Sequence, residues 1–372
     1  MVARISAAMG SALIPSAAEV SFTSARCAGR RIAGVPAAAR IVRELAEAGF
    51  ASVSLVLPEG ETLDRSTRVE VRRLAGRMEV REGETGSDTD RARLPGDRLI
   101  PAGSIAAFLT GEQPASAIDL AGPDAGAEIL RRTQKLTDGP VSRWLNRPVS
   151  RRLSALLLEV PGLMPLHASL GTALLALAMF VVLIAGGAPG LIVGGLLFQA
   201  ASVFDGVDGE VARATFRTSP AGARLDTLID TITTLLFLAG LTINLASSGR
   251  QDAVVLAAWG IGLFLIGLAL IARRSAATGG SLDFLRIKRH YRDRFSRGIA
   301  RRLIDFATVV TSRDFFALLF AVLLVVGLPM AVLYIFAAAA SLWIFFVIGA
   351  TVPMRSVAVA PGLTTSGEAG PS

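Results

Sequence analysis

The chain is poor in the side chains that build many common sites. Of its 372 residues, one is cysteine and two are histidine. The single Cys27 excludes an internal disulfide framework. The histidines, His167 and His290, have no partner at metal-ligand spacing, so we assign them no role. Lysine is also scarce, since only Lys135 and Lys288 contribute to the 38 basic residues.

Positive charge is therefore carried almost wholly by arginine, and the formal net charge is +8. Arginine pairs bidentately with phosphate, which favours an anionic lipid or a phosphorylated substrate. The basic residues cluster beside apolar segments without interleaved aromatic residues, which argues against a nucleic-acid partner.

Two further absences concern the N-terminal part. Residues 1–20 contain one arginine but no sustained apolar run, so we expect no secretory signal peptide. Residues 1–31 also lack the glycine-rich, arginine-containing loop that cradles a triphosphate.

Long uncharged runs dominate the second half of a chain that is 52% hydrophobic. They cover residues 160–204, 231–249, 253–272 and 315–354. One membrane span needs about 20 apolar residues, so the first and last runs should each divide in two, near Gly187 and Pro329. The pattern predicts an α-helical membrane bundle of six transmembrane helices, preceded by a soluble α/β domain.

A charged motif stands between the second and third expected spans. On a helix, Asp205 and Asp208 fall on one face at i and i+3, with Ala212 at i+7. Gly209 and Arg213 lie beside them, and the small glycine leaves room for a ligand to approach the backbone.

A second helix follows after a short turn. Ser219 is a suitable N-cap and Pro220 a suitable first helical residue. Gly222, Asp226 and Asp230 then repeat at i, i+4 and i+8 along one stripe. The two helices should bring four carboxylates together at the edge of the membrane.

The position of these acids makes a merely solvated charged face unfavourable. Each carboxylate costs about 2.5–3.5 kcal/mol at the centre of a membrane helix, and four would repel one another without cations. A set of oxygen ligands without His or Cys favours Mg²⁺ or Mn²⁺ over zinc. The predicted metal ligands are Asp205, Asp208, Asp226 and Asp230.

The motif Asp-x-x-Asp-Gly-x-x-Ala-Arg-x8-Gly-x-x-x-Asp-x-x-x-Asp resembles the signature of the CDP-alcohol phosphotransferases at all eight specified positions. The resemblance implies that the first three acids hold two Mg²⁺ ions, or Mn²⁺, on the donor pyrophosphate. It makes Asp230 a further ligand or the general base, and has Arg213 contact phosphate. The implied CDP-binding residues are Asp208, Gly209, Ala212, Arg213 and Gly222.

The same resemblance implies the reaction and the partners. A phosphoalcohol would pass from CDP-inositol or CDP-diacylglycerol to a hydroxyl acceptor, such as an inositol phosphate or another polyol phosphate, with release of CMP. The setting would be phospholipid or polar headgroup biosynthesis by a homodimer among membrane lipids. A transporter or ion-binding protein is the alternative, although we find no internal repeat.

Arginine placement predicts the orientation. Residues 273–314 carry 11 basic and 4 acidic side chains, and the segment before the first span and the motif turn are also basic. The positive-inside rule then places both termini and the site on the cytoplasmic side of the inner membrane. Basic residues there contact either lipid headgroups or the acceptor phosphate. The acceptor candidates are Arg143, Arg147, Arg273, Arg274, Arg292 and Arg313.

The N-terminal part predicts α/β elements. We expect a helix over 36–48 with Gly49 as its C-cap, a strand over 51–57, a strand at 99–100, a helix over 105–109, and an exposed loop over 81–97. The stretch from Gly34 through Gly49 resembles sugar nucleotidyltransferases, as in the bifunctional inositol-phosphate cytidylyltransferases. Because the phosphate loop is missing, we interpret the domain as degenerate rather than as an active cytidylyltransferase.

The chain accordingly divides into four parts. Residues 135–150 resemble the segment that leads into the membrane half of inositol-type enzymes, and an amphipathic helix in the membrane interface should follow. The parts are a cytosolic α/β domain at 1–130, a junction with that helix at 131–160, the six-helix domain at 161–354, and a disordered tail at 355–372.

Overall fold

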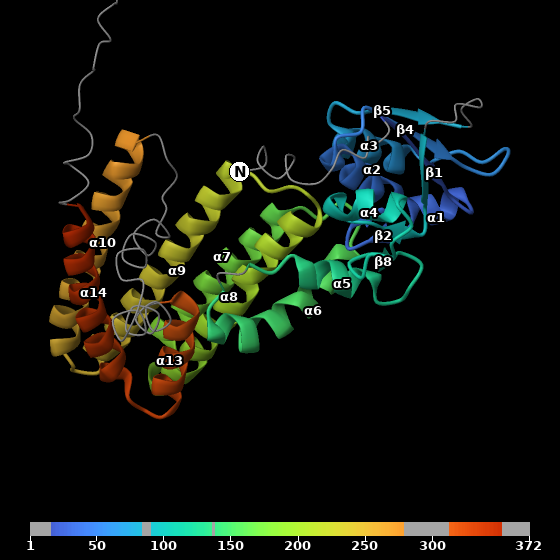
Figure 1. Cartoon of the computed structure of the whole chain (residues 1–372). Helices are drawn as coiled ribbons and strands as arrows, with labels where there is room; N and C mark the ends of the chain where they lie inside the picture. Colours follow the sequence, from blue (N-terminus) through green and yellow to red (C-terminus); the bar gives the residue numbers. More distant parts are fainter. Residues whose placement is uncertain (1–15, 84–90, 136–137, 279–311, 352–372) are drawn as a thin grey trace, which may run out of the picture. The chain divides into compact units, whose positions relative to one another are not determined.

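The computed structural model describes residues 16–83, 91–135, 138–278 and 312–351 (Figure 1). The chain forms two compact units. Unit 1 comprises Met1–Thr137, Pro148–His167 and Gly206–Thr218, and unit 2 comprises Asp138–Arg147, Ala168–Asp205 and Ser219–Ser372. The motif is therefore shared, because Asp208 to Arg213 belong to unit 1 whereas Asp205, Asp226 and Asp230 belong to unit 2.

Unit 1 contains a four-stranded parallel sheet in the order β5-β4-β1-β6. Its strands are β1 (Ala17–Ser21), β4 (Ser52–Val56), β5 (Glu79–Glu82) and β6 (Arg91–Pro95). Val20 of β1 pairs with Leu55 on one side and Leu94 on the other. All three side chains are buried, so the core follows the central strands.

Helices and short ladders complete unit 1. Figure 1 shows α2 (Ala37–Ala48) and α3 (Arg65–Ala75) side by side next to the sheet. The other helices are α1 (Ala25–Gly29), α4 (Ile105–Leu109), α5 (Ala125–Arg132), α6 (Arg147–Leu158) and the short η2 (Ala102–Ser104), and all of α6 except its first residue belongs to unit 1. Two-stranded ladders pair β2 (Arg31–Ile32) with β3 (Val35–Pro36), and β7 (Arg98–Leu99) with β8 (Ile118–Asp119).

Most sequence predictions for this domain are confirmed. The expected helices over 36–48 and 105–109 form α2 and α4, and β4 lies inside the expected strand over 51–57. Gly49 ends α2 in the left-handed region with φ of 94°. Of the strand expected at 99–100, only Leu99 lies in a strand, namely β7.

The exposed loop expected over 81–97 is wrong at the start of β6 and beyond, whereas residues 84–90 lie outside the described residues. The end of β5 and all of β6 fall within it. In β6 the side chains of Ala92 and Leu94 are buried and Arg93 is exposed. Arginines at alternate positions gave the segment a polar composition that hid this two-residue period.

Unit 2 is helical. Its elements are the π-helical turn η3 (Ser142–Asn146), α7 (Pro165–Ala185), α8 (Gly187–Ala214), α9 (Pro220–Ser247), α10 (Asp252–Thr278), α13 (Arg313–Val325) and α14 (Pro329–Thr351). The first residues of α7 and the last residues of α8 belong to unit 1. Five of these helices, α7 to α10 and α14, are long and apolar enough to cross a membrane. The fifth expected span corresponds to α13, whose 13 residues extend about 20 Å against a hydrocarbon core of about 30 Å. Six spans are therefore not confirmed.

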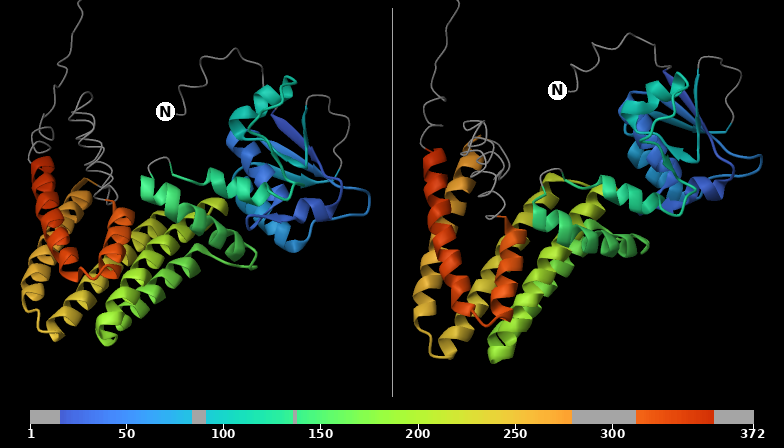
Figure 2. Two further views of the ribbon diagram at one scale, coloured as in Figure 1. Left: turned by 90° about the horizontal axis from the view of Figure 1, so that it is seen from below. Right: turned by 60° about the horizontal axis from the view of Figure 1, so that its bottom comes forward.

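Aromatic and small residues pack these helices together. The Phe237 ring of α9 stacks on Phe198 of α8 and Phe320 of α13, with centroids 4.1 and 6.0 Å away. Figure 2 shows α10 beside α14, where a Cβ at Gly267 would overlap the Trp343 ring. The stacked rings hold together the three helices that carry the acids and Arg313.

Candidate functional site

Three carboxylates of the motif meet in unit 2. Asp205 on α8 and Asp226 and Asp230 on α9 each offer an oxygen, and these oxygens lie within 4.8 Å of one another. Asp208 follows one turn after Asp205 on the same helix and is 8% exposed, but it is not part of this trio. Three oxygen ligands at this spacing suit a hard divalent cation.

Local sequence determines where α9 begins. The Ser219 hydroxyl accepts a hydrogen bond from the Gly222 amide at 3.0 Å, and Pro220 opens the helix, as predicted. A Cβ at Gly222 would lie 3.2 Å from the Ser219 oxygen. Glycine at this position therefore leaves the cap undisturbed. The cap fixes where α9 begins, and the four-residue spacing then places Asp226 and Asp230 one turn apart on that helix.

Arg313 lies against the trio. One guanidinium nitrogen is 2.9 Å from Asp205, and the same nitrogen contacts Asp230. Its Nε and Nη2 are buried and have no hydrogen-bond partner within the part of the chain that the structure describes. Buried N–H groups without a partner are costly, so this arginine presents donors suited to an anionic ligand.

A polar network holds the start of α13, and so positions Arg313. The Asp314 carboxylate accepts hydrogen bonds from Asn146 at 3.1 Å and from Ser202 at 3.0 Å. Gln199 donates to the Asn146 side chain at 2.9 Å. Sequence reasoning missed this network, although an acid next to Arg313 at the edge of an apolar run was a usable signal.

Steric contact explains why the motif has glycine at position 209 of α8. A Cβ at Gly209 would lie 2.9 Å from Nη1 of Arg213, which sits one turn further along. The Arg213 Nε donates to the Thr133 carbonyl oxygen at 2.6 Å. Gly209 therefore allows the Arg213 side chain to lie along the helix. The Nε–H group of its guanidinium is used in the hydrogen bond to Thr133.

The acid motif also contains a buried glutamate, Glu210, whose hydrogen bonds the sequence did not predict. Its side chain is fully buried and accepts hydrogen bonds from Ser150 and Ser154, each at 2.7 Å. The two serines are four residues apart on α6, so they share one helical face. The four-residue spacing of the two serines, together with an acid two residues after Asp208, was the sequence pattern that could have predicted this contact.

The other acceptor candidates are placed differently. Arg147 is buried and pairs with Asp138 at 2.8 Å, whereas the side chains of Arg143 and Arg273 are exposed. The Arg274 side chain, Arg292 and the expected tail at 355–372 lie outside the described residues. Among the candidates whose side chains the structure describes, Arg313 is the one that lies against the acid trio.

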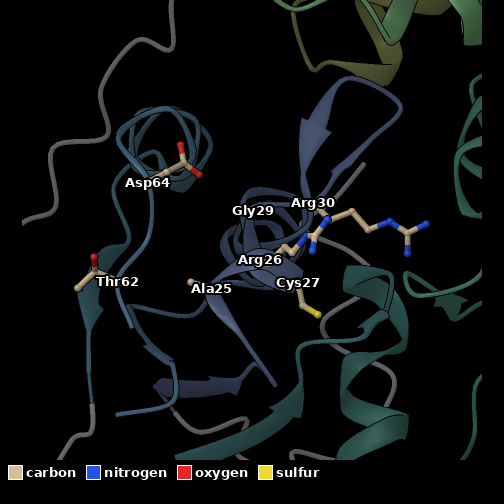
Figure 3. A pocket seen from close by; sticks show the side chains of 7 residues that line it. All are labelled: Ala25, Arg26, Cys27, Gly29, Arg30, Thr62 and Asp64. Atoms are coloured by element: carbon tan, nitrogen blue, oxygen red, sulfur yellow. The ribbon is translucent and has the colours of Figure 1, made fainter. Parts of the chain in front are cut away.

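The α/β domain contains a cavity of about 630 Å³. Figure 3 shows it between α1 and the start of α3, lined by Ala25, Arg26, Cys27, Gly29, Arg30, Thr62 and Asp64. Its ionic groups are largely engaged with the protein. Arg30 donates to the carbonyls of Leu120 and Ala121, and Asp64 caps α3. Hydrogen bonds from Ser66 and Thr67 hold the Asp64 pKa below its usual value.

Comparison with known proteins agrees with the acid motif. The model of the CDP-alcohol phosphatidyltransferase family matches residues 164–360, just over half of the chain. Curated relatives include proteins named "Bifunctional IPC transferase and DIPP synthase". The Aquifex aeolicus protein is 43% identical over 111 residues, 30% of this chain and 24% of the relative. The Archaeoglobus fulgidus protein is 38% identical over 104 residues, 27% of this chain and 20% of the relative.

A protein of the same name from Thermococcus kodakarensis is 40% identical over 114 residues, 30% of this chain. The chain thus spans about a quarter of the length of the curated relatives that it matches. The family match includes the whole acid motif, several apolar helices and Arg313. This chain is a multi-pass membrane protein and belongs to the CDP-alcohol phosphatidyltransferase family.

Proposed function

We propose that the protein transfers a phosphoalcohol from a CDP-activated donor to a hydroxyl acceptor and releases CMP. The observation that carries this proposal is the convergence of three carboxylates and Arg313 between membrane helices of this family. The names of the relatives support the inositol phosphate or related polyol phosphate acceptor suggested by residues 135–150. CDP-inositol and CDP-diacylglycerol are the candidate donors.

The residues present fit a divalent metal ion. Asp205, Asp226 and Asp230 would hold it, with Asp208 as a fourth candidate ligand and a second ion as the family pattern implies. A bound Mg²⁺ would supply positive charge to the phosphate oxygens. The oxygen-only donor set suits Mg²⁺ or Mn²⁺ better than softer metals.

The chain's own groups account for the remaining chemistry. The acceptor oxygen forms a bond to the phosphorus of the donor phosphoalcohol, and the bond to CMP breaks. The proton of the acceptor hydroxyl passes to a carboxylate, for which Asp230 is the candidate general base. Nε and Nη2 of Arg313 donate to phosphate oxygens, and Gly209 and Arg213 shape the CDP site.

We place the site at the cytoplasmic face of the inner membrane. The basic character of the segments beside the motif supports this orientation through the positive-inside rule. A homodimer is the assembly that the family resemblance suggests.

CMP release tests the proposal. Purified protein with Mg²⁺, one of the two donors and an inositol phosphate should liberate CMP, and mass spectrometry should identify the phosphodiester. Absence of CMP with every donor and acceptor would contradict the function. Asp252→Asn, at the exposed start of α10, is the control.

Asp230→Asn assigns the role of that residue. If Asp230 is the base, the variant should lose CMP release on the order of a hundredfold or more while it still binds Mn²⁺ in electron paramagnetic resonance titrations. Loss of both properties would instead make Asp230 a metal ligand.

A further inference from the structure

Residues 206–218 lie in unit 1 together with the α/β domain. They include the end of α8, which carries Asp208 and Arg213, and the turn before α9. The last four carbonyls of a helix have no partner within that helix. At the end of α8, side chains of the α/β domain bind the carbonyl of the last residue, Ala214, and the carbonyls of the two residues that follow it.

The turn itself ends α8 in a Schellman arrangement. The Arg217 amide donates to the Ala212 carbonyl at 2.8 Å, and the Phe216 amide donates to the Arg213 carbonyl at 3.3 Å. Phe216 adopts φ of 55°, a left-handed conformation that usually selects glycine. A phenylalanine here needs support from outside the turn.

Arg40 of α2 supplies part of that support. It is 2% exposed and donates to the carbonyls of Ile32 at 2.9 Å, Ala33 at 2.9 Å and Ala214 at 2.8 Å. Burial lowers the pKa of Arg40 to about 9, although Glu44 raises it in part. The buried cation also stands at the negative end of the α8 dipole.

Arg73 and Glu70 of α3 hold the next residues. Arg73 donates to the carbonyls of Thr215 at 2.8 Å and Phe216 at 3.2 Å. Glu70 pairs with Arg73 at 2.7 Å and with Arg217 at 2.9 Å. The Glu70 carboxylate thus joins the domain to the turn through Arg217, and it also holds Arg73, which binds the carbonyls of the same turn.

The half-buried Phe216 ring packs against the same domain. It packs against the apolar core, and the guanidinium carbons of Arg40 and Arg43 lie 5.5 and 5.8 Å from its centroid. At Gly34, with φ of 81°, a Cβ would lie 3.2 Å from the Thr215 side chain. The domain surface therefore fits this turn closely in shape as well as in charge.

We propose that the α/β domain is a clamp on the carboxyl end of α8, which keeps Asp208 and Arg213 in the orientation that the transfer reaction needs. Arg73 and Glu70 are positioning residues in this scheme, and they act through the backbone of residues 214–217. The link to catalysis rests on the proposed function. The clamp gives a role to a nucleotidyltransferase-like domain without a triphosphate loop.

Hydrogen exchange of the full chain in lipid nanodiscs tests the clamp directly. Arg73→Ala should increase amide exchange in residues 206–218 by about tenfold, while β1 and β4 exchange as in the wild type. Arg72→Ala, an exposed neighbour on the same helix, is the matched control and should change neither region. Arg73→Lys should restore part of the protection. Unchanged exchange in Arg73→Ala would overturn the clamp.

Kinetics then test positioning. Arg73→Ala should raise the KM for the CDP donor by about fivefold or more, with a smaller change in kcat, because Asp208 and Arg213 face the donor in the proposed function. Faster exchange in 206–218 with unchanged KM and kcat would overturn the positioning role. If the wild type releases no CMP, the proposed function fails, yet the exchange result still decides whether the clamp exists.

A global loss of structure would be recognised from exchange in β1 and β4. In that event Glu70→Gln, which keeps the size of the side chain but loses its charge, replaces Arg73→Ala in both measurements. It is expected to loosen residues 206–218 alone. Wild-type protection in Glu70→Gln would then overturn the clamp.

Discussion

The part of the acid motif in unit 1 and the part in unit 2 differ in whether their buried charged groups have partners within the protein. In unit 1, Glu210 accepts hydrogen bonds from two buried serines, and Arg40 and Arg73 donate to backbone carbonyls. In unit 2, three carboxylates converge on Arg313, two of whose buried nitrogens lack a hydrogen-bond partner among the described residues. The first arrangement satisfies its own groups, whereas the second leaves groups that a ligand can satisfy.

This difference has an energetic meaning. Satisfied buried polar networks contribute to folding, because removing one member leaves another without a partner. Clustered like charges that await a ligand cost stability and are retained for function. Substitutions in unit 2 should therefore lower activity with little loss of stability, whereas substitutions of Glu210 in unit 1 should lower stability.

The largest expected effect is on activity in unit 2. Asp226→Asn removes one charge of the trio and leaves the ion pairs of Arg313 with Asp205 and Asp230 in place. CMP release should fall on the order of a thousandfold, since a metal ligand is lost. The melting temperature in metal-free buffer should stay level or rise, because repulsion between carboxylates decreases.

Mn²⁺ titration provides the independent measurement for Asp226→Asn, which should bind the ion more weakly than the wild type. Asp252→Asn again serves as the control for a charge change at a helix end. A clear fall in the metal-free melting temperature of Asp226→Asn would break the comparison, because it would show that the trio is a structural network like that of Glu210.

An intermediate effect, this time on stability, is expected in unit 1. Glu210→Ala leaves the buried hydroxyls of Ser150 and Ser154 without their acceptor and opens a cavity. The cost should be about 2–4 kcal/mol in the free energy of unfolding, measured by thermal unfolding in one detergent. Glu210→Gln keeps the shape and one acceptor oxygen, so it should lose less than half as much. Equal losses would mean that charge, rather than hydrogen bonding, dominates at this position.

Local patterns predicted the elements whose cause is local. The spacing of Asp226 and Asp230 with the Ser219-Pro220 cap predicted the acidic stripe of α9, and the glycines near 187 predicted the break between α7 and α8. Gly49 likewise predicted the end of α2. In each case the deciding interactions lie within a few residues of one another, so one sequence window contains them.

Features that depend on distant partners were not predictable in this way. Arg40 reads as an ordinary helix arginine, and only the fold places the Ala214 carbonyl against it. The strand β6 needed β1 beside it to bury Ala92 and Leu94. Asp208 shares a helix face with Asp205, yet the oxygens that meet come from Asp205 and the α9 acids. Helical periodicity predicts on which face of its helix a residue lies, but the packing between helices decides which faces meet.

The smallest effect concerns the turn that joins the two halves. Phe216→Gly keeps the left-handed conformation but removes its steric cost, which gains about 1 kcal/mol, and it loses the ring contacts with Arg40, Arg43 and the core. The two changes nearly cancel, so thermal unfolding should place Phe216→Gly within about 1 kcal/mol of the wild type. Phe216→Ala loses the ring and keeps a Cβ in the left-handed region, so it should be less stable than Phe216→Gly. If alanine proves as stable as glycine, the strain at this turn is absent, and the contacts of the domain alone determine how α8 ends.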